Sequence, residues 1–247
     1  MRARRPKYVY VAYHKCATRF TERVVRDVCQ LHGLRAAAFD QRRPKVGWWA
    51  LRSMDFLLLT DYSRGMLDLG SLDVRGFHVI RDPRDLLVSM YFSHRYSHSE
   101  SHEEIARNRA QLAGRDDQEG LRYMMDESAF FNRVVEEFGA WNYERDNFFE
   151  TTFEKLTGGP ERAFRAIFDF LGLEVGEREL RAVLDRNSFS NLKDAWAARN
   201  PAAEVNHYRR GVSGDWKLHL DGEAKEVFRE RYGNLLVKLG YESDDRW

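Results

Sequence analysis

The sequence predicts an α/β protein with one domain, built on a central parallel β-sheet with helices on both faces. Two short apolar runs, at residues 8–13 and 77–80, are each followed by a tight loop and a helical pattern. A third apolar run, at 55–60, lies between them and is typical of a fully buried parallel strand. A chain of 247 residues with 43% hydrophobic content is long enough for one substantial core.

The first strand stops at His14, and a helix is expected from the helical spacing of Phe20, Val24, Val25, Val28 and Leu31, with a left-handed stop at Gly33. The helix dipole and the free N–H groups of its first turn suit an anion, and Lys15 adds a charge. Residues 10–20 contain no glycine, which excludes the loop of nucleoside-triphosphate enzymes. An ordinary strand–helix unit with a surface lysine is the alternative.

After the strand at 77–80, Asp82 is predicted as a helix N-cap with Pro83 at the first helical position. Leu86, Leu87, Met90 and Tyr91 form the predicted buried stripe. Arg81 and Ser89 could then face a second phosphate, and a capped helix with solvated arginines is the alternative. Far along the chain, residues 209–217 hold two glycines and three cations, as a loop that closes over an anionic ligand would.

In order and spacing, these segments resemble the sulfotransferases that use 3′-phosphoadenosine-5′-phosphosulfate (PAPS), the cytosolic type and its bacterial relatives. The family motifs PKSGTTW, RDPRDxxVSxY and RKGxxGDWK correspond to residues 14–20, 81–91 and 209–217. The resemblance implies a P-loop-like fold, PAPS as co-substrate and 3′-phosphoadenosine-5′-phosphate (PAP) as product. It departs from the family at Ala17, which replaces a glycine, and at Phe20, which replaces a tryptophan.

The resemblance also implies roles for individual residues. The 5′-phosphosulfate would be held by the first loop, through Lys15, Cys16, Ala17, Thr18, Arg19 and Phe20, and the 3′-phosphate by Arg81, Ser89, Arg209, Arg210 and Gly211. Phe153 matches an aromatic that lies on the adenine, and Phe189 matches the end of a TSF segment. Residues 218–241 are similar to the closing helix of the family, and residues 95–140 are the least alike.

The implied reaction is in-line transfer of a sulfuryl group to a hydroxyl or amine, without a metal. Lys15 would neutralise the departing oxygen. Asp61 stands where the family has its histidine base and is the candidate base, although it could instead cap a turn with Ser63. His94 is the rival base, although a histidine on that helix is more often a core residue.

The acceptor is left open by the sequence. Nine aromatic residues could line a pocket for a lipophilic alcohol or could belong to the core: Trp48, Trp49, Tyr62, Tyr91, Phe92, Tyr96, Tyr123, Phe130 and Phe131. The polar region 95–127 could instead accept a carbohydrate. Two other functions remain open, a non-catalytic protein that binds 3′-phosphoadenosine nucleotides and a kinase of the P-loop type.

Composition bears on partners and location. A net charge of +1 argues against a nucleic-acid partner, and no stretch reaches transmembrane length, so neither nucleic acid nor a membrane is expected. Two cysteines suit a reducing cytoplasm, and Cys16 is either a reactive thiol or a small residue that packs.

The expected domain is 1–247, with a flexible basic tail at 1–7, a variable acceptor region at 95–140 and a closing loop at 194–217. The oligomeric state is open.

Overall fold

A computed structural model of the chain describes residues 7–43, 45–98, 102–200, 209–244 and 246–247. The chain divides into two compact units. Unit 1 comprises Met1–Ile80 and Asn142–Asn191, and unit 2 comprises Arg81–Trp141 and Leu192–Trp247. Most of the predicted tail at 1–7 and residues 201–208 of the predicted closing loop lie outside the described residues.

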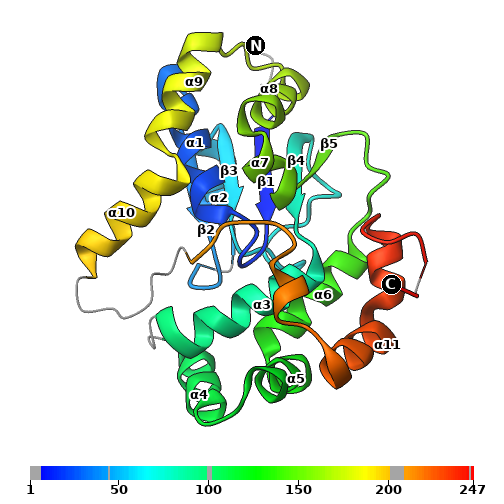
Figure 1. Ribbon diagram of the computed structural model, residues 1–247. Helices are drawn as coiled ribbons and strands as arrows, with labels where there is room; N and C mark the ends of the chain where they lie inside the picture. Colours follow the sequence, from blue (N-terminus) through cyan, green and yellow to red (C-terminus); the bar gives the residue numbers. More distant parts are fainter. Residues whose placement is uncertain (1–6, 44, 99–101, 201–208, 245) are drawn as a thin grey trace. The chain divides into compact units, whose positions relative to one another are not determined.

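Unit 1 contains a five-stranded, wholly parallel sheet in the order β2-β3-β1-β4-β5 (Figure 1). Its strands are β1 (Lys7–Ala12), β2 (Ala36–Phe39), β3 (Phe56–Leu59), β4 (Val74–Ile80) and β5 (Phe148–Thr152). Every residue of β3 is buried, as the continuous apolar run predicts. The parallel sheet therefore confirms the predicted α/β class.

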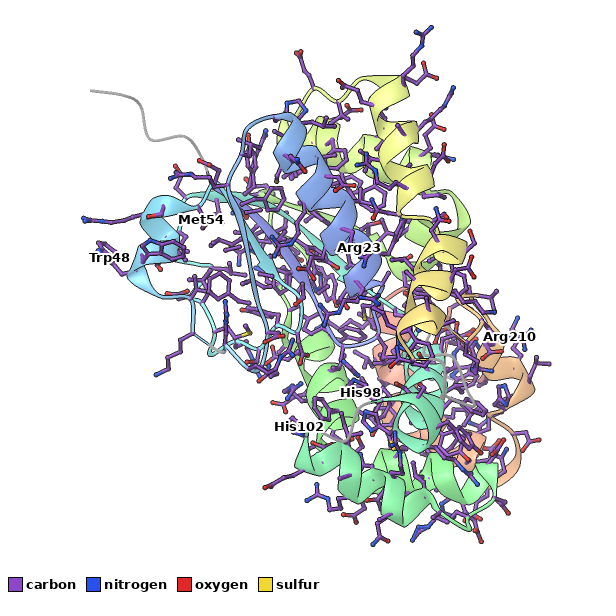
Figure 2. The ribbon with its side chains drawn as sticks, turned by 90° about the vertical axis from the view of Figure 1, so that its left-hand side faces the viewer. Arg23, Trp48, Met54, His98, His102 and Arg210 are labelled. Atoms are coloured by element: carbon purple, nitrogen blue, oxygen red, sulfur yellow. The ribbon has the colours of Figure 1, made fainter. Side chains whose placement is uncertain are left out.

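The helices of unit 1 cover both faces of this sheet. They are α1 (Thr18–Leu31), α2 (Trp48–Ser53), α7 (Phe153–Gly158), α8 (Pro160–Leu171) and α9 (Glu177–Arg186). α9 packs against both α1 and α8, whereas α2 lies on the opposite side of the strands from α1 (Figure 2). The connection from β1 to β2 and the connection from β2 to β3 cross the sheet in opposite directions. Because both crossovers are right-handed, their helices α1 and α2 lie on opposite faces.

The buried stripe of α1 differs from the prediction at its end. Val24, Val25 and Val28 are buried as expected, but Leu31 is 53% exposed, and Cys29 lies in the core instead. The helix stops at Leu31, and Gly33 adopts the predicted left-handed conformation with φ +63°. The periodicity thus located the helix but extended its buried face by one turn too many.

Unit 2 is helical in its described residues. It contains α3 (Pro83–Phe92), the π-helical segment η1 (Ser93–Ser97), α4 (Glu103–Leu112), α5 (Asp117–Glu127), α6 (Ala129–Ala140), the 3₁₀ turn η2 (Asp215–Leu218) and α11 (Gly222–Lys238). α10 (Phe189–Arg199) begins in unit 1 and ends in unit 2. Among the described residues, no helix is long and apolar enough to cross a membrane.

Candidate functional site

The first loop joins β1 to α1 in a strained conformation. Lys15 and Ala17 both have positive φ, at 66° and 57°, although neither is a glycine. This left-handed region crowds the Cβ of an L-residue against its own backbone, so the fold must enforce it. A backbone bond from Cys16 N–H to the Tyr13 carbonyl, 3.1 Å long, closes the turn. The loop therefore has the compact shape predicted for it, without the glycine that usually permits it.

The loop leaves the start of α1 without a side-chain cap. Ala17 is the N-cap residue, and its carbonyl accepts the N–H of Thr21 at 3.0 Å, but no side chain caps the first turn. The N–H groups of Thr18, Arg19 and Phe20 then have no acceptor within the helix. No acidic residue occupies this turn. An anion fits this end of α1 by both hydrogen bonding and charge.

Two other loop residues have packing roles. Phe20 packs edge-on against Phe164 of α8, with ring centroids 5.5 Å apart. Cys16 is fully buried and its thiol lies 3.8 Å from the carbonyl oxygen of His14. Of the two alternatives for Cys16, burial supports the small packing residue over the reactive thiol.

Asp61 lies at the same edge of the sheet as the first loop. In the parallel pairing of β1 with β3, Leu59 is beside Val11, and the N–H of Tyr62 donates to the carbonyl of Ala12 at 2.9 Å. The carboxyl ends of the two strands thus bring Asp61 and the loop to one edge. Asp61 is buried, and its carbonyl accepts a 2.9 Å bond from the Gln41 amide.

His94 belongs to a polar network inside unit 2. It lies in η1, fully buried, and its Nδ1 is 3.1 Å from the amide nitrogen of Asn108. The side-chain amide oxygen of Asn108 accepts in turn from the Tyr123 hydroxyl at 3.1 Å. His94 thus has the surroundings of a core histidine.

The start of α3 is capped as predicted but its arginine is not solvated. The Asp82 carboxylate accepts the N–H of Arg84 at 2.9 Å, with Pro83 at the first helical position. Arg84 is buried, pairs with Asp82 at 2.8 Å and with Glu242, and lies over the ring of Trp216, 4.0 Å from its centroid. The alternative of a capped helix with solvated arginines is therefore wrong for Arg84.

The described closing segment, residues 209–217, is fastened to α3. The Asp85 carboxylate accepts the N–H groups of Gly214 at 2.7 Å and Trp216 at 2.9 Å. Arg209 lies over the ring of Phe92, 4.2 Å from its centroid, and Phe92 is one turn beyond Ser89. The structure thus brings the Arg209 end of this segment to the helix that carries Ser89.

The charges in this region are arranged around two buried carboxylates. Arg209 and Arg210 both pair with Asp215, the latter at 3.0 Å. Burial raises the pKa of Asp85, while the charge of Arg81 and the N–H groups of Trp216 and Gly214 oppose that rise. Arg81 itself is buried directly after β4. Two of the predicted anion-binding arginines are therefore held by a carboxylate.

The remaining predicted binding residues differ in their exposure. Phe153 is buried at the start of α7, whereas Phe189 is partly exposed at the start of α10. Trp48 and Trp49 are 65% and 66% exposed, so neither belongs to the core. Four others are core residues: Tyr62, Tyr91, Phe130 and Phe131.

Sequence reasoning missed a buried chain of polar groups next to the first loop. The Nδ1 atom of His78, in β4, is 2.6 Å from a Glu150 carboxylate oxygen, and its Nε2 atom is 3.1 Å from the Tyr13 hydroxyl. Burial lowers the pKa of His78, and Glu150 opposes this. The neutral His78 ring therefore donates a hydrogen bond from Nδ1 to Glu150 and accepts one at Nε2 from the Tyr13 hydroxyl. The only sequence signal was two polar residues within apolar strands.

Comparison with known proteins gives relatives that cover most of the chain. Sulfotransferase 2A1 of Macaca fascicularis is 21% identical over an alignment of 261 residues, gaps included, and the alignment covers 95% of this chain and 85% of that protein. Sulfotransferase 2B1 of Mus musculus is 27% identical over 172 residues, which cover 63% of this chain. The match spans 46% of that protein, about half its length.

Solved structures share the fold. The crystal structure of mouse sulfotransferase SULT7A1 complexed with PAP has a TM-score of 0.68 at 18% identity, covering 97% of this chain and 88% of that one. Retinol dehydratase in complex with retinol and PAP has a TM-score of 0.62 at 16% identity, covering 95% and 82%.

Among the described residues, no group of three or more His, Cys, Asp or Glu side chains is arranged to hold a metal ion.

The family described as the sulfotransferase domain matches residues 6–240, nearly the entire chain. The chain belongs to the sulfotransferase domain family.

Proposed function

We propose that this protein transfers a sulfuryl group from PAPS to a hydroxyl or amine of a small-molecule or carbohydrate acceptor. The observation that carries the proposal is the first loop, whose left-handed Lys15 and Ala17 leave the start of α1 open to an anion. Strained backbone of this kind clusters at active and ligand-binding sites, which supports a binding role for this loop. PAPS supplies the sulfuryl group and the leaving phosphate.

The first loop would bind the 5′ end of the nucleotide. Backbone N–H groups and the Thr18 hydroxyl would hold the 5′-phosphate, and the Lys15 ammonium would neutralise the charge that develops on the departing oxygen. Phe20 is fixed against Phe164 and would present the rest of its ring to the nucleotide.

Within unit 2, the 3′-phosphate would be bound by Arg81 and Ser89 together with Arg209, Arg210 and Gly211. The closing segment is fastened to α3 by Asp85, which supports a shared role for these residues. Gly211 has φ +67°, a conformation that also lets backbone approach a ligand closely. By family resemblance, Phe153 is proposed as an adenine contact and Phe189 as a further nucleotide contact.

Asp61 is proposed as the general base because it lies at the same sheet edge as Lys15. It would accept the acceptor proton as the sulfuryl group is transferred. His94 remains the rival, but its Nδ1 is engaged by Asn108 within the helical unit. Retinol dehydratase has been solved with retinol and with androsterone, which favours a lipophilic alcohol as the acceptor over a carbohydrate. A cytoplasmic location remains a prediction.

A calorimetric titration with PAP, ATP and ADP, with and without magnesium, tests the donor site without knowledge of the acceptor. Tight binding of PAP that is independent of magnesium is the expected result. A preference for ATP with magnesium would overturn the proposal in favour of a kinase.

Catalysis is tested separately, with lipophilic alcohols, phenols and amines as acceptors. Lys15→Ala should abolish turnover at saturating PAPS, whereas the exposed control Lys155→Ala should not change it. Asp61→Asn should lower turnover and leave PAP binding intact.

The second candidate, a non-catalytic PAP-binding protein, is favoured by two departures from the family, Ala17 and the absent histidine at Asp61. Magnesium-independent PAP binding with no turnover of any acceptor would support it. Turnover that survives Lys15→Ala would contradict the role given to this lysine.

A further inference from the structure

The connection between β2 and β3 carries an exposed cluster that the proposed reaction does not use. We call it the tryptophan-basic patch. Its members are Trp48, Trp49, Arg42, Arg43, Lys45, Arg52 and Arg64, and all of them are exposed. β2 is the outermost strand on one side of the sheet in unit 1, so the patch lies beside that strand.

The two tryptophans stand next to each other on the surface. Trp48 and Trp49 open the six-residue helix α2, and about two thirds of each side chain is exposed. Figure 2 shows Trp48 at the outer end of this segment and Met54 nearer the strands. A tryptophan side chain is large and usually mostly buried, so two adjacent exposed ones indicate an interaction surface.

The surroundings of the tryptophans are basic. Residues 41–54 contain four cations and no acid. The acids that flank this segment along the chain each pair with an arginine, Asp40 with Arg42 of the patch at 2.7 Å and Asp55 with Arg35 at 3.2 Å. A backbone bond of 3.2 Å from Val46 N–H to the Met66 carbonyl holds the turn that carries Arg64 beside this segment. The patch therefore combines apolar area with a local excess of positive charge.

We propose that the tryptophan-basic patch docks this protein reversibly on an anionic lipid membrane. Tryptophan favours the headgroup level of a bilayer, where its ring is in an apolar layer and its N–H meets water. Arginine and lysine side chains reach back to the lipid phosphates, and each adds attraction to an anionic leaflet. The proposal departs from the expectation of no membrane partner, because docking on a surface does not require a stretch of transmembrane length.

Other occupants fit these observations less well. A symmetric pair of copies would face one basic patch with another, and like charges disfavour that contact. Single-stranded nucleic acid would need open aromatic faces for stacking. The guanidinium of Arg52 lies 4.6 Å from the ring centroid of Trp48 and occupies one of its faces. At a bilayer, Arg52 would keep its contact with the Trp48 ring while its guanidinium also reaches the lipid headgroups.

The test is sedimentation of the full chain with vesicles. One set is pure phosphatidylcholine, and the other contains about one third phosphatidylserine, which gives a strongly negative surface. Binding to the anionic vesicles is expected, with a blue shift of tryptophan fluorescence and a loss of binding at high salt.

Variants identify the patch. The double change Trp48→Ala and Trp49→Ala should weaken vesicle binding by at least about ten-fold, and the triple change Arg42→Gln, Arg43→Gln and Lys45→Gln by about one hundred-fold. Matched controls elsewhere in unit 1 are the exposed Leu31→Ala and Arg178→Gln, which should bind as the unchanged protein does.

Circular dichroism confirms that each variant is folded. The patch residues lie outside the proposed nucleotide-binding residues, so PAP binding should persist in both multiple variants. Three outcomes would overturn the proposal: no binding to anionic vesicles, equal loss in the controls, or a preference for a single-stranded oligonucleotide over the vesicles at the same salt.

Discussion

Replacing Ala17 with glycine should stabilise the protein, although it removes a side chain. Ala17 has φ 57° and ψ 22°, a left-handed conformation that costs an L-residue about 1–2 kcal/mol. Glycine adopts it without that cost but loses about 0.4–1 kcal/mol through the greater freedom of its unfolded chain. The difference is a gain of about 0.5–1 kcal/mol. Because Ala17 is an N-cap with no side-chain bond, no capping interaction is lost.

Gly172 provides the reverse experiment in the same unit. It follows α8 with φ +70° and ψ 30°, and a Cβ placed there would meet no atom within 4 Å. Gly172→Ala therefore introduces the same backbone strain without a clash and should cost about 1 kcal/mol. The two changes isolate one quantity, the cost of a Cβ in the left-handed region.

The assay is urea unfolding followed by circular dichroism, with thermal melts alongside. In a chain of this size, about 1 kcal/mol shifts the melting temperature by about 2–4 °C. Ala17→Gly should raise the midpoint and Gly172→Ala should lower it. If Ala17→Gly lowered the midpoint while Gly172→Ala behaved as expected, the strain assigned to the first loop would be refuted, because the method would have detected strain elsewhere.

Three further predictions concern buried groups. Arg84→Ala should destabilise the protein by about 3 kcal/mol in urea unfolding, because it removes the buried guanidinium that pairs with Asp82 and Glu242; a cost below 1 kcal/mol would contradict this. Burial raises the pKa of Cys29 to about 12, so this buried thiol should not react with a thiol reagent near pH 8 until the chain unfolds. Because burial lowers the pKa of His78, the unfolded chain binds the proton first, and stability should fall as pH drops below about 6.5. His78→Gln should reduce this dependence, and the exposed His32→Gln should not.

The elements that the sequence predicted well are those with local signals. Within the predicted strand at 55–60, residues 56–59 are apolar on both alternating sets of positions, which is typical of a strand covered on both faces. Asp82 and Pro83 specify a helix start through their own chemistry, an acceptor for an N–H and a fixed φ. In each case the structure depends on residues within a few positions, so the prediction could succeed without knowledge of the rest of the fold.

Features that depend on distant residues could not be predicted. His78 meets Glu150 at a separation of 72 residues and Tyr13 at 65, and nothing in the local pattern of β4 indicates either partner. Burial of aromatic residues is the same kind of property. Trp48 and Tyr62 look alike in an apolar pattern, but one is on the surface and the other is in the core, because only the packed fold decides what covers them.

The closing segment contains an interaction that its motif alone did not indicate. Glycines and cations predicted a loop around an anion, and the structure adds that Asp215 of the same segment is buried and pairs with both Arg209 and Arg210. Two adjacent arginines repel each other, and a buried carboxylate between their charges offsets that repulsion before any ligand arrives. If a 3′-phosphate binds there, it meets arginines that are already oriented, and it must share them with Asp215. Strong binding therefore depends on how many guanidinium N–H groups face away from Asp215, because each guanidinium offers five donors and one carboxylate cannot occupy them all.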